Sequence, residues 1–176
     1  MTTSRADLAR AIYDTAHITG QFTLRSGATS TEYFDKYRLE ADPALLHAVA
    51  EAMVELVPPG IDALAGLELG GVPLATMLSQ LTGLPALFVR KKAKDYGTCQ
   101  FAEGGEVAGR RLLVVEDVIT SGGQVVASTA DLRNEGATID DVVCVIDREA
   151  GGGQALTVAG LKLRAVFTMS DLKTAS

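Results

Sequence analysis

The sequence lacks any apolar run long enough to cross a membrane, and it has only 2 cysteines among its 176 residues. A membrane-spanning helix needs about 20 consecutive apolar residues, so none is expected. Cys99 and Cys144 are far apart and provide neither a disulfide framework nor a metal-binding spacing. The first 16 residues also lack the apolar segment of a secretory signal peptide. We therefore expect a cytoplasmic protein with Cys144 in its core.

An excess of positive charge is also lacking. The chain has 16 Lys and Arg residues against 22 Asp and Glu, a formal net charge of −6. This balance argues against general nucleic-acid binding. Against that background, four cations fall between positions 90 and 94: Arg90, Lys91, Lys92 and Lys94. A solvated surface is the usual explanation of such a run. In an acidic protein, a basic loop that binds an anionic ligand is the interpretation we favour.

The most informative stretch spans residues 111–123 and reads RLLVVEDVITSGG. Its apolar run over residues 112–115 is too short for a helix and is typical of a strand buried on both faces of a parallel sheet. The carboxylates of Glu116 and Asp117 follow at once. A loop of small residues comes next, and a helical pattern begins after it. The stretch therefore predicts a strand, an acidic pair, a glycine loop and a helix.

This arrangement suits a phosphorylated ribose. Ligands of open α/β sheets bind beyond the carboxyl ends of the strands. There the loop can present backbone N–H groups, two hydroxyls and the positive end of the next helix to a phosphate. Two carboxylates would repel that phosphate, but they can accept hydrogen bonds from a ribose diol. We interpret the stretch as a ribose-5-phosphate site.

Two other interpretations of the stretch remain. One is an ordinary strand-to-helix connection in which an acid caps the helix. The other is a P-loop, which requires the pattern G-x-x-x-x-G-K-[ST]. Residues 104–111, GGEVAGRR, have the glycine spacing but carry arginines where Lys-Ser belongs.

Strand and helix patterns alternate along the chain without a repeat or a linker. Such alternation predicts one α/β domain with a mostly parallel sheet flanked by helices. Residues 91–109 show no periodicity, and a loop of that length is usually a functional lid or disordered. We expect a first helix from Ser4 to Gly20 and a short strand containing Tyr33, Phe34 and Tyr37. Buried strands are expected within residues 61–67, 86–89, 112–115, 141–147 and 163–168.

Four segments resemble type I phosphoribosyltransferases, and three of them resemble the orotate-specific family in particular. VVEDVITSGG is similar to the signature that binds phosphoribosyl pyrophosphate (PRPP). The orotate-type segments are FTLRSG, FVRKKAKDYGT and IDRE, at residues 22–27, 88–98 and 146–149. The resemblance implies a phosphoribosyltransferase-type sheet in a single domain, 1–176, with an N-terminal hood over residues 1–40 and a core over 41–176. It implies a pentosyltransferase that uses PRPP and orotate to form orotidine 5′-monophosphate and pyrophosphate in pyrimidine biosynthesis.

The same resemblance implies a set of site residues. The catalytic groups would be Lys91 and Lys94 of a mobile loop, together with Glu116 and Asp117. The loop would also contribute Arg90 and Tyr96, which stands where many members have histidine. Many members carry lysine at the position of Gly70. The other substrate contacts would be Arg25 (where lysine is usual), Tyr33, Phe34, Val118, Ile119, Thr120, Ser121, Gly122, Gly123 and Arg148, which would bind the orotate carboxylate.

The resemblance further implies Mg²⁺ bound through PRPP, with no metal site made by protein side chains alone. It implies a homodimer in which the loop of one subunit reaches the active site of the other. No nucleic acid or membrane is expected as a partner. Two other functions remain open: a regulator that senses PRPP without catalysis, and a transferase for a purine or another base.

Overall fold

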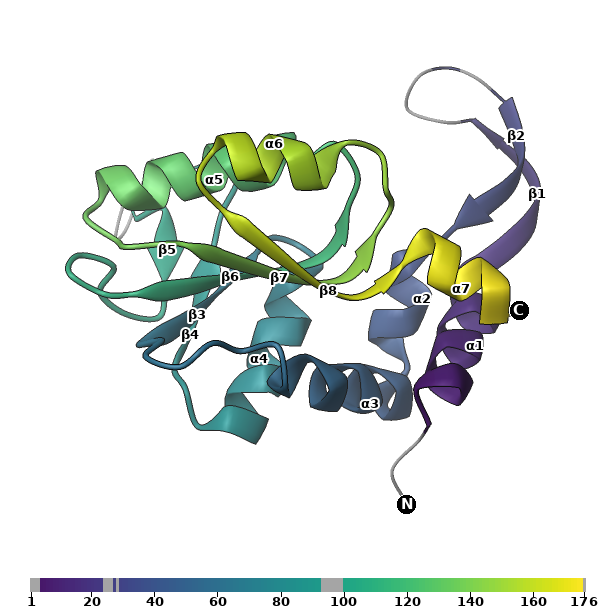
Figure 1. The fold of residues 1–176 in the computed structure, drawn as a ribbon, viewed down its shortest axis with the longest axis horizontal. Helices are drawn as coiled ribbons and strands as arrows, with labels where there is room; N and C mark the ends of the chain where they lie inside the picture. Colours follow the sequence, from purple (N-terminus) through teal and green to yellow (C-terminus); the bar gives the residue numbers. More distant parts are fainter. Residues whose placement is uncertain (1–3, 24–26, 28, 93–99, 176) are drawn as a thin grey trace.

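The computed structural model of the protein describes residues 4–23, 27, 29–92 and 100–175. A six-stranded sheet in the order β5-β4-β3-β6-β7-β8 forms its centre, and helices cover both faces (Figure 1). Neighbouring strands are parallel except for β5, which pairs antiparallel with β4. This confirms the predicted class, α/β with a mostly parallel sheet. The strands are β3 (Ala63–Leu67), β4 (Ala86–Val89), β5 (Ala102–Glu103), β6 (Leu112–Ile119), β7 (Asp141–Asp147) and β8 (Lys162–Thr168).

The core forms two apolar layers, one on each face of the sheet. Successive residues of a strand point to opposite faces. Leu113 and Val115 of β6 therefore join the layer that includes α3 and α4, whereas Leu112 and Val114 join the layer that includes α5 and α6. β6 is thus buried on both faces, as the sequence predicted. The helices are α1 (Arg5–Ala16), α2 (Lys36–Ala41), α3 (Pro43–Val54), α4 (Gly71–Thr82), α5 (Gly123–Asn134), α6 (Gly152–Val158) and α7 (Met169–Ala175).

A small antiparallel sheet of two strands, β1 (His17–Thr23) and β2 (Thr29–Phe34), projects from the body of the molecule (Figure 1). α1 begins as predicted, since the Ser4 hydroxyl accepts a hydrogen bond of 3.1 Å from the backbone N–H of Asp7. Its predicted end at Gly20 is wrong. The helix stops at Ala16, because His17 is extended and pairs with Phe34 of β2. Pairing with a distant strand overrides the local helical pattern.

The structure also corrects the prediction that Tyr37 lies in the second strand. Asp35 caps α2 instead, and its carboxylate accepts a hydrogen bond of 3.2 Å from the backbone N–H of Tyr37. The N–H of Asp35 donates to the carbonyl of Ala16 at 2.7 Å, which ties the end of the hairpin to the end of α1. α2 has six residues, so it is too short to show helical periodicity in the sequence.

The carboxyl-terminal helix α7 was not predicted, and it packs against α1. The first and last helices of the described chain therefore lie side by side below the hairpin (Figure 1). Among the residues that the structure describes, no helix has both the length and the apolar character needed to cross a membrane.

Candidate active site

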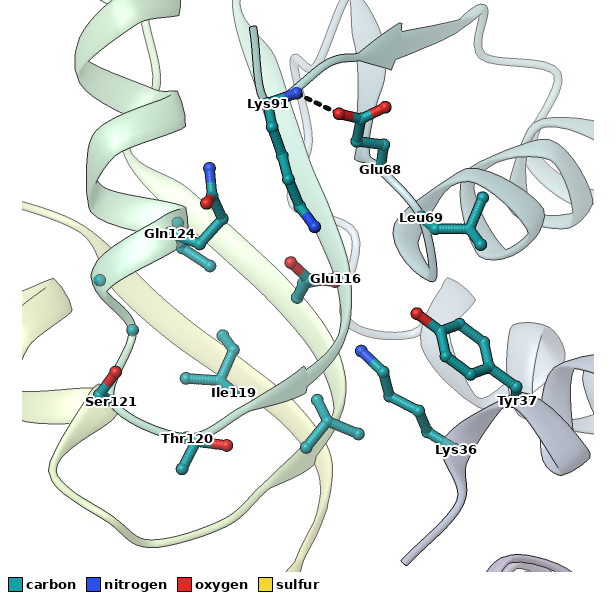
Figure 2. Close-up of a pocket in the computed structure, with 14 residues that line it drawn as sticks. Lys36, Tyr37, Glu68, Leu69, Lys91, Glu116, Ile119, Thr120, Ser121 and Gln124 are labelled. Atoms are coloured by element: carbon teal, nitrogen blue, oxygen red, sulfur yellow. Dashed lines mark hydrogen bonds between the residues drawn. The ribbon is translucent and has the colours of Figure 1, made fainter. Parts of the chain in front are cut away.

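A cavity of about 320 Å³ opens at the carboxyl end of β6 (Figure 2). One side is formed by the end of β6, the loop after it and the first turn of α5. The other side is formed by α2, by the turn before α4 and by the segment after β4. The lining residues are Lys36, Tyr37, Glu68, Leu69, Lys91, Glu116, Val118, Ile119, Thr120, Ser121, Gly122, Gly123, Gln124 and Val125. The predicted ribose-phosphate stretch therefore lines a real cavity.

The loop at residues 120–123 has free donors for an anion. Gly122 is the N-cap of α5 and has φ of 75°, a conformation that glycine adopts without strain. No side chain caps α5, so its first backbone N–H groups have no side-chain acceptor. The first-turn residues of α5 line the cavity together with Thr120 and Ser121. Backbone N–H groups and the helix dipole make such a helix start an anion-binding site.

The start of α6 supports this loop from behind. A Cβ atom at Gly152 would lie 2.5 Å from the Ile119 side chain and 2.6 Å from the carbonyl oxygen of Thr120. Gly152 therefore allows the backbone of α6 to lie directly against the loop.

Glu116 lines the cavity and is 9% exposed. One of its carboxyl oxygens, Oε1, accepts a hydrogen bond of 3.0 Å from the backbone N–H of Asp117. Burial raises the pKa of Glu116 well above its usual range, and the charge of the neighbouring Asp117 acts in the same direction. Glu116 therefore presents a buried carboxyl group to the cavity, and its contact with ribose hydroxyls stays a prediction.

Asp117 has a different environment from the one expected. It is 1% exposed and does not line the cavity. Its Oδ2 atom lies 2.6 Å from Nζ of Lys36, on α2. Burial by itself would raise the pKa of Asp117. Hydrogen bonds from Glu116 and Lys36, together with the positive charge of Lys36, hold the pKa below its usual range instead. The sequence assigned both carboxylates to the ribose, whereas the structure places only Glu116 on the cavity.

Sequence reasoning missed Lys36, Tyr37 and Glu40. Lys36 and Glu40 are four residues apart on α2, so they lie on one face of that helix. Burial raises the pKa of Glu40 to about 8, and a hydrogen bond to Asp117 and the charge of Asp117 add to the effect. The only sequence signal was a pair of charges at helical spacing directly after the hood. That signal was missed because the predicted strand extended to Tyr37 and so covered the start of α2.

Among the described residues of the basic run at positions 90–94, Lys91 lines the cavity. Figure 2 shows its side chain extending across the cavity toward Glu116. Its backbone N–H donates a hydrogen bond of 2.5 Å to Oε1 of Glu68 (Figure 2). Arg90 does not line the cavity, and its Nε lies 3.6 Å from a carboxylate oxygen of Glu103 on β5. Lys94 and Tyr96 lie outside the described residues.

The described residues that were expected to surround the base, Tyr33, Phe34 and Arg148, do not line the cavity. Arg25 lies outside the described residues. Phe34 packs against the core, and Tyr33 is 45% exposed and contacts Phe22, with ring centroids 5.4 Å apart. Arg148 is exposed directly after β7 and does not line the cavity. Two large exposed side chains that were not predicted do line it: Tyr37 and Leu69, at 47% and 64% exposed.

Comparison with known proteins identifies the class first. The family model described as "Phosphoribosyl transferase domain" matches residues 37–159, which include the sheet strands β3 to β7 and every residue that lines the cavity except Lys36. The fold, with a glycine loop that leads into an uncapped helix at the carboxyl edge of a mostly parallel sheet, is therefore that of a phosphoribosyltransferase.

Individual relatives and solved structures identify the family within this class. An orotate phosphoribosyltransferase from Nocardioides sp. (strain ATCC BAA-499 / JS614) is 59% identical over 170 residues, covering 97% of this chain and 95% of that protein. The orotate phosphoribosyltransferase of Mycobacterium tuberculosis H37Rv in complex with Fe(III) dicitrate has a TM-score of 0.87 and 33% identity, covering 96% of this chain and 98% of that one. The same enzyme in complex with PRPP has a TM-score of 0.82 and 30% identity, over 96% and 98% of the two chains. This chain belongs to the orotate phosphoribosyltransferase family.

Proposed function

We propose that the cavity beyond β6 is where this chain carries out the reaction of its family, the transfer of a 5-phosphoribosyl group from PRPP to orotate. The products are orotidine 5′-monophosphate and pyrophosphate. One observation carries the assignment to this cavity. The loop at residues 120–123 leads into the uncapped start of α5, and Glu116 lies beside it on the same cavity wall. Phosphate donors and a diol acceptor are thereby placed side by side.

The 5-phosphate is assigned to the loop. The hydroxyls of Thr120 and Ser121 and the first N–H groups of α5 would donate hydrogen bonds to its oxygens, and the positive end of the α5 dipole would attract its charge. The ribose would then extend from this loop toward Glu116, whose carboxyl group accepts from a ribose hydroxyl. The pyrophosphate would lie on the side of the cavity where Lys91 enters.

The chemistry needs positioning and charge more than a nucleophile. The bond between C1 of the ribose and the pyrophosphate oxygen breaks as N1 of orotate bonds to C1, and the proton of N1 is transferred to the leaving pyrophosphate or to solvent. Negative charge develops on the leaving pyrophosphate, and C1 becomes electron-poor. Lys91 would stabilise the negative charge on the leaving pyrophosphate. The carboxyl groups at the end of β6 would stabilise the electron-poor C1. Lys94 is proposed to assist Lys91 on the evidence of the sequence alone.

Mg²⁺ fits this cavity as a partner of the substrate. In the described part of the chain, no three side chains of His, Cys, Asp or Glu form a metal-binding group. Glu116 provides one carboxylate at the cavity, and magnesium commonly combines one or two carboxylates with substrate phosphates and water. Bound in that way, the ion would offset the negative charge of the leaving pyrophosphate, while Glu116 would orient the ribose to which the ion is bound.

The orotate ring is assigned to the side of the cavity facing α2. Tyr37 and Leu69 expose apolar surface there, and a planar pyrimidine can pack on such surface. The carboxylate of orotate is assigned to Arg148, because a guanidinium can bind a carboxylate with two parallel hydrogen bonds. Arg25 and the hood residues Tyr33 and Phe34 remain proposed contacts that the sequence resemblance implies.

We further propose a homodimer in which the segment containing Lys94 reaches the partner's active site. The support is the resemblance of residues 88–98 to the loop of the family. The hood over residues 1–40 and the core over 41–176 are proposed as parts of a single domain. A cytoplasmic location also stays a prediction, and the buried thiol of Cys144 is compatible with it.

One assay tests the proposed function. Purified protein is incubated with PRPP, Mg²⁺ and one base at a time, and pyrophosphate release is measured. We expect release with orotate, and none above background with adenine, guanine, hypoxanthine or uracil. Release with a purine but not with orotate would favour a purine transferase. PRPP binding without release for any base would favour a PRPP-sensing regulator.

A further inference from the structure

Lys36 places a positive charge where the sequence gives little reason to expect one. It is the first residue of α2, directly after the cap residue Asp35 and two residues after the end of β2. Its Nζ atom lies 2.6 Å from Oδ2 of Asp117, and its side chain is 34% exposed against 1% for that of Asp117. Lys36 also lines the cavity, where Figure 2 shows its ammonium group pointing inward. The ion pair therefore joins α2 to the strand that ends in the active site.

Gly70 provides the space for this ion pair. A Cβ atom at that position would overlap the carboxylate of Asp117 and would lie 2.8 Å from Oε1 of Glu40. The Asp117 side chain thus occupies the volume that a side chain at position 70 would need. Asp117 is enclosed by the backbone of Gly70 on one side and by Lys36 and Glu40 of α2 on the other.

Asp117 in turn fixes the residue that faces the ligand. Its backbone N–H donates to Oε1 of Glu116 at 3.0 Å. One of its own carboxylate oxygens, Oδ1, accepts from the backbone N–H of Val118 at 2.5 Å. The chain of contacts runs from Lys36 through Asp117 to Glu116 and Val118, which both line the cavity. A shift of the Asp117 side chain would therefore move the backbone and the side chains of the cavity wall.

Lys36 provides a positive charge beside the three acids Glu40, Glu116 and Asp117. Glu40, Glu116 and Asp117 lie close together, and burial works against the ionised form of each. The pKa values of Glu40 and Glu116 are raised, whereas that of Asp117 is lowered with help from Lys36. Asp117 is thus the acid of the three whose lowered pKa favours the ionised form, and Lys36 is its ion-pair partner.

We propose that Lys36 is a positioning residue for the phosphoribosyl transfer, which holds Asp117 as an anion beside Gly70 and thereby keeps Glu116 directed at the ribose. Because Lys36 directly follows the hood hairpin, it also couples the position of the hood to the catalytic strand. This inference rests on the proposed function, since it assigns Lys36 a part in that reaction. A merely structural ion pair would predict lower stability but unchanged kinetics in the folded enzyme.

The test compares Lys36→Met and Lys36→Arg with the matched control Lys162→Met. Lys162 is an exposed lysine at the opposite end of the parallel sheet strands, at the start of β8. The full chain is assayed with orotate, PRPP and Mg²⁺ across a range of pH. Lys36→Met is expected to lower kcat about 100-fold, as for a misplaced active-site group, with Lys36→Arg recovering part of the loss. Lys162→Met should match the unmodified chain.

The pH profile separates positioning from folding. Removing the cation raises the pKa of Asp117, so the acidic limb of the kcat profile should move to higher pH in Lys36→Met by about one pH unit or more. Carboxyl carbon NMR of the ligand-free protein should show the same direction of change for Asp117. An unchanged kcat and an unchanged acidic limb in folded Lys36→Met would overturn the proposal.

If Lys36→Met does not fold, the double variant Lys36→Met/Asp117→Asn takes its place. Removing both buried charges together is often tolerated where removing one is not. The proposal expects this variant to fold and to have a kcat about as low as that of Asp117→Asn alone. Activity equal to that of the unmodified chain would overturn the role of Lys36. Absence of orotate turnover in the unmodified chain would instead contradict the proposed function itself.

Discussion

The backbone N–H of Arg148 donates a hydrogen bond of 2.9 Å to the carbonyl oxygen of Ile119. This bond joins the first residue after β7 to the last residue of β6. Arg148 therefore starts from the same edge of the sheet as the loop at residues 120–123, although its side chain does not line the cavity in this structure. A long, exposed side chain anchored at this point is well placed to close onto a carboxylate when orotate binds.

The first prediction concerns Arg148. Arg148→Ala should raise the KM for orotate much more than the KM for PRPP, because a charge-assisted contact worth roughly 1.5–3 kcal/mol is lost. Lysine at this position should restore only part of the affinity, since it cannot form the two parallel bonds of a guanidinium. Steady-state kinetics with each substrate varied in turn would measure this. Arg111→Ala, which removes an exposed arginine at the other end of β6, is the matched control. Equal weakening of both substrates would show that Arg148 is not the carboxylate site.

The second prediction concerns the acidic pair. Replacing Glu116 by Gln and Asp117 by Asn together keeps the shape of both side chains and removes their charge. The fold should survive, because the neutral amides can retain several of the hydrogen bonds, while kcat should fall by about 100-fold or more. Circular dichroism checks folding, and pyrophosphate release measures turnover. Activity within a few-fold of the unmodified chain would remove both residues from the mechanism.

The third prediction tests the support behind the phosphate loop. Gly152→Ala adds a methyl group that would lie 2.6 Å from the carbonyl oxygen of Thr120, so the loop must shift. We expect kcat/KM for PRPP to fall about 10- to 100-fold. Gly153→Ala is the matched control, because a Cβ atom there meets its nearest neighbour at 3.8 Å, an ordinary contact. If the two variants have similar kcat/KM values, contact between α6 and the loop has no part in PRPP binding.

The fourth prediction is a pH dependence of stability. The pKa of Glu40 is about 8 in the folded protein, against an ordinary value of 4.5. The folded state therefore binds a proton that the unfolded state has released, and this contribution to stability is lost as pH rises from about 4.5 through about 8. Glu40→Gln mimics the protonated form and should lose less stability over that interval than the unmodified chain. Thermal unfolding at several values of pH would measure the difference. Parallel curves for the two proteins would contradict the prediction.

The fifth prediction tests the shared active site. Lys94→Ala and Arg148→Ala should each be nearly inactive when assayed alone at low orotate concentration. If Lys94 acts in the partner's site and Arg148 in its own, mixed dimers contain one intact site and one doubly defective site. Random exchange should then restore roughly a quarter of all sites. Activity is followed after mixing, and subunit exchange is checked with an independent label. Exchange without recovery would contradict the shared-site model.

The sequence by itself determined the central strand β6 and the glycine loop that leads into α5. β6 could be predicted from the sequence because a strand of four consecutive apolar residues, 112–115, buries both of its faces only inside a sheet. The start of α1 at Ser4 was predictable for a similar reason, since the Ser4 hydroxyl accepts from the N–H of Asp7 at 3.1 Å within its own turn. Such signals depend only on residues that are neighbours in the sequence, so they can be recognised without the structure. Sequence similarity then fixed the family.

Only the tertiary structure decided what surrounds the two acids. Glu116 and Asp117 are neighbours in the sequence, but the cavity receives Glu116, while Asp117 is held by Lys36, 81 positions earlier in the chain. The six-residue helix that carries Lys36 is too short to leave a periodic pattern, and the sequence does not show that the Asp117 side chain fills the space beside Gly70. Contacts between distant segments depend on how the sheet and α2 pack, and local sequence preferences do not encode that packing.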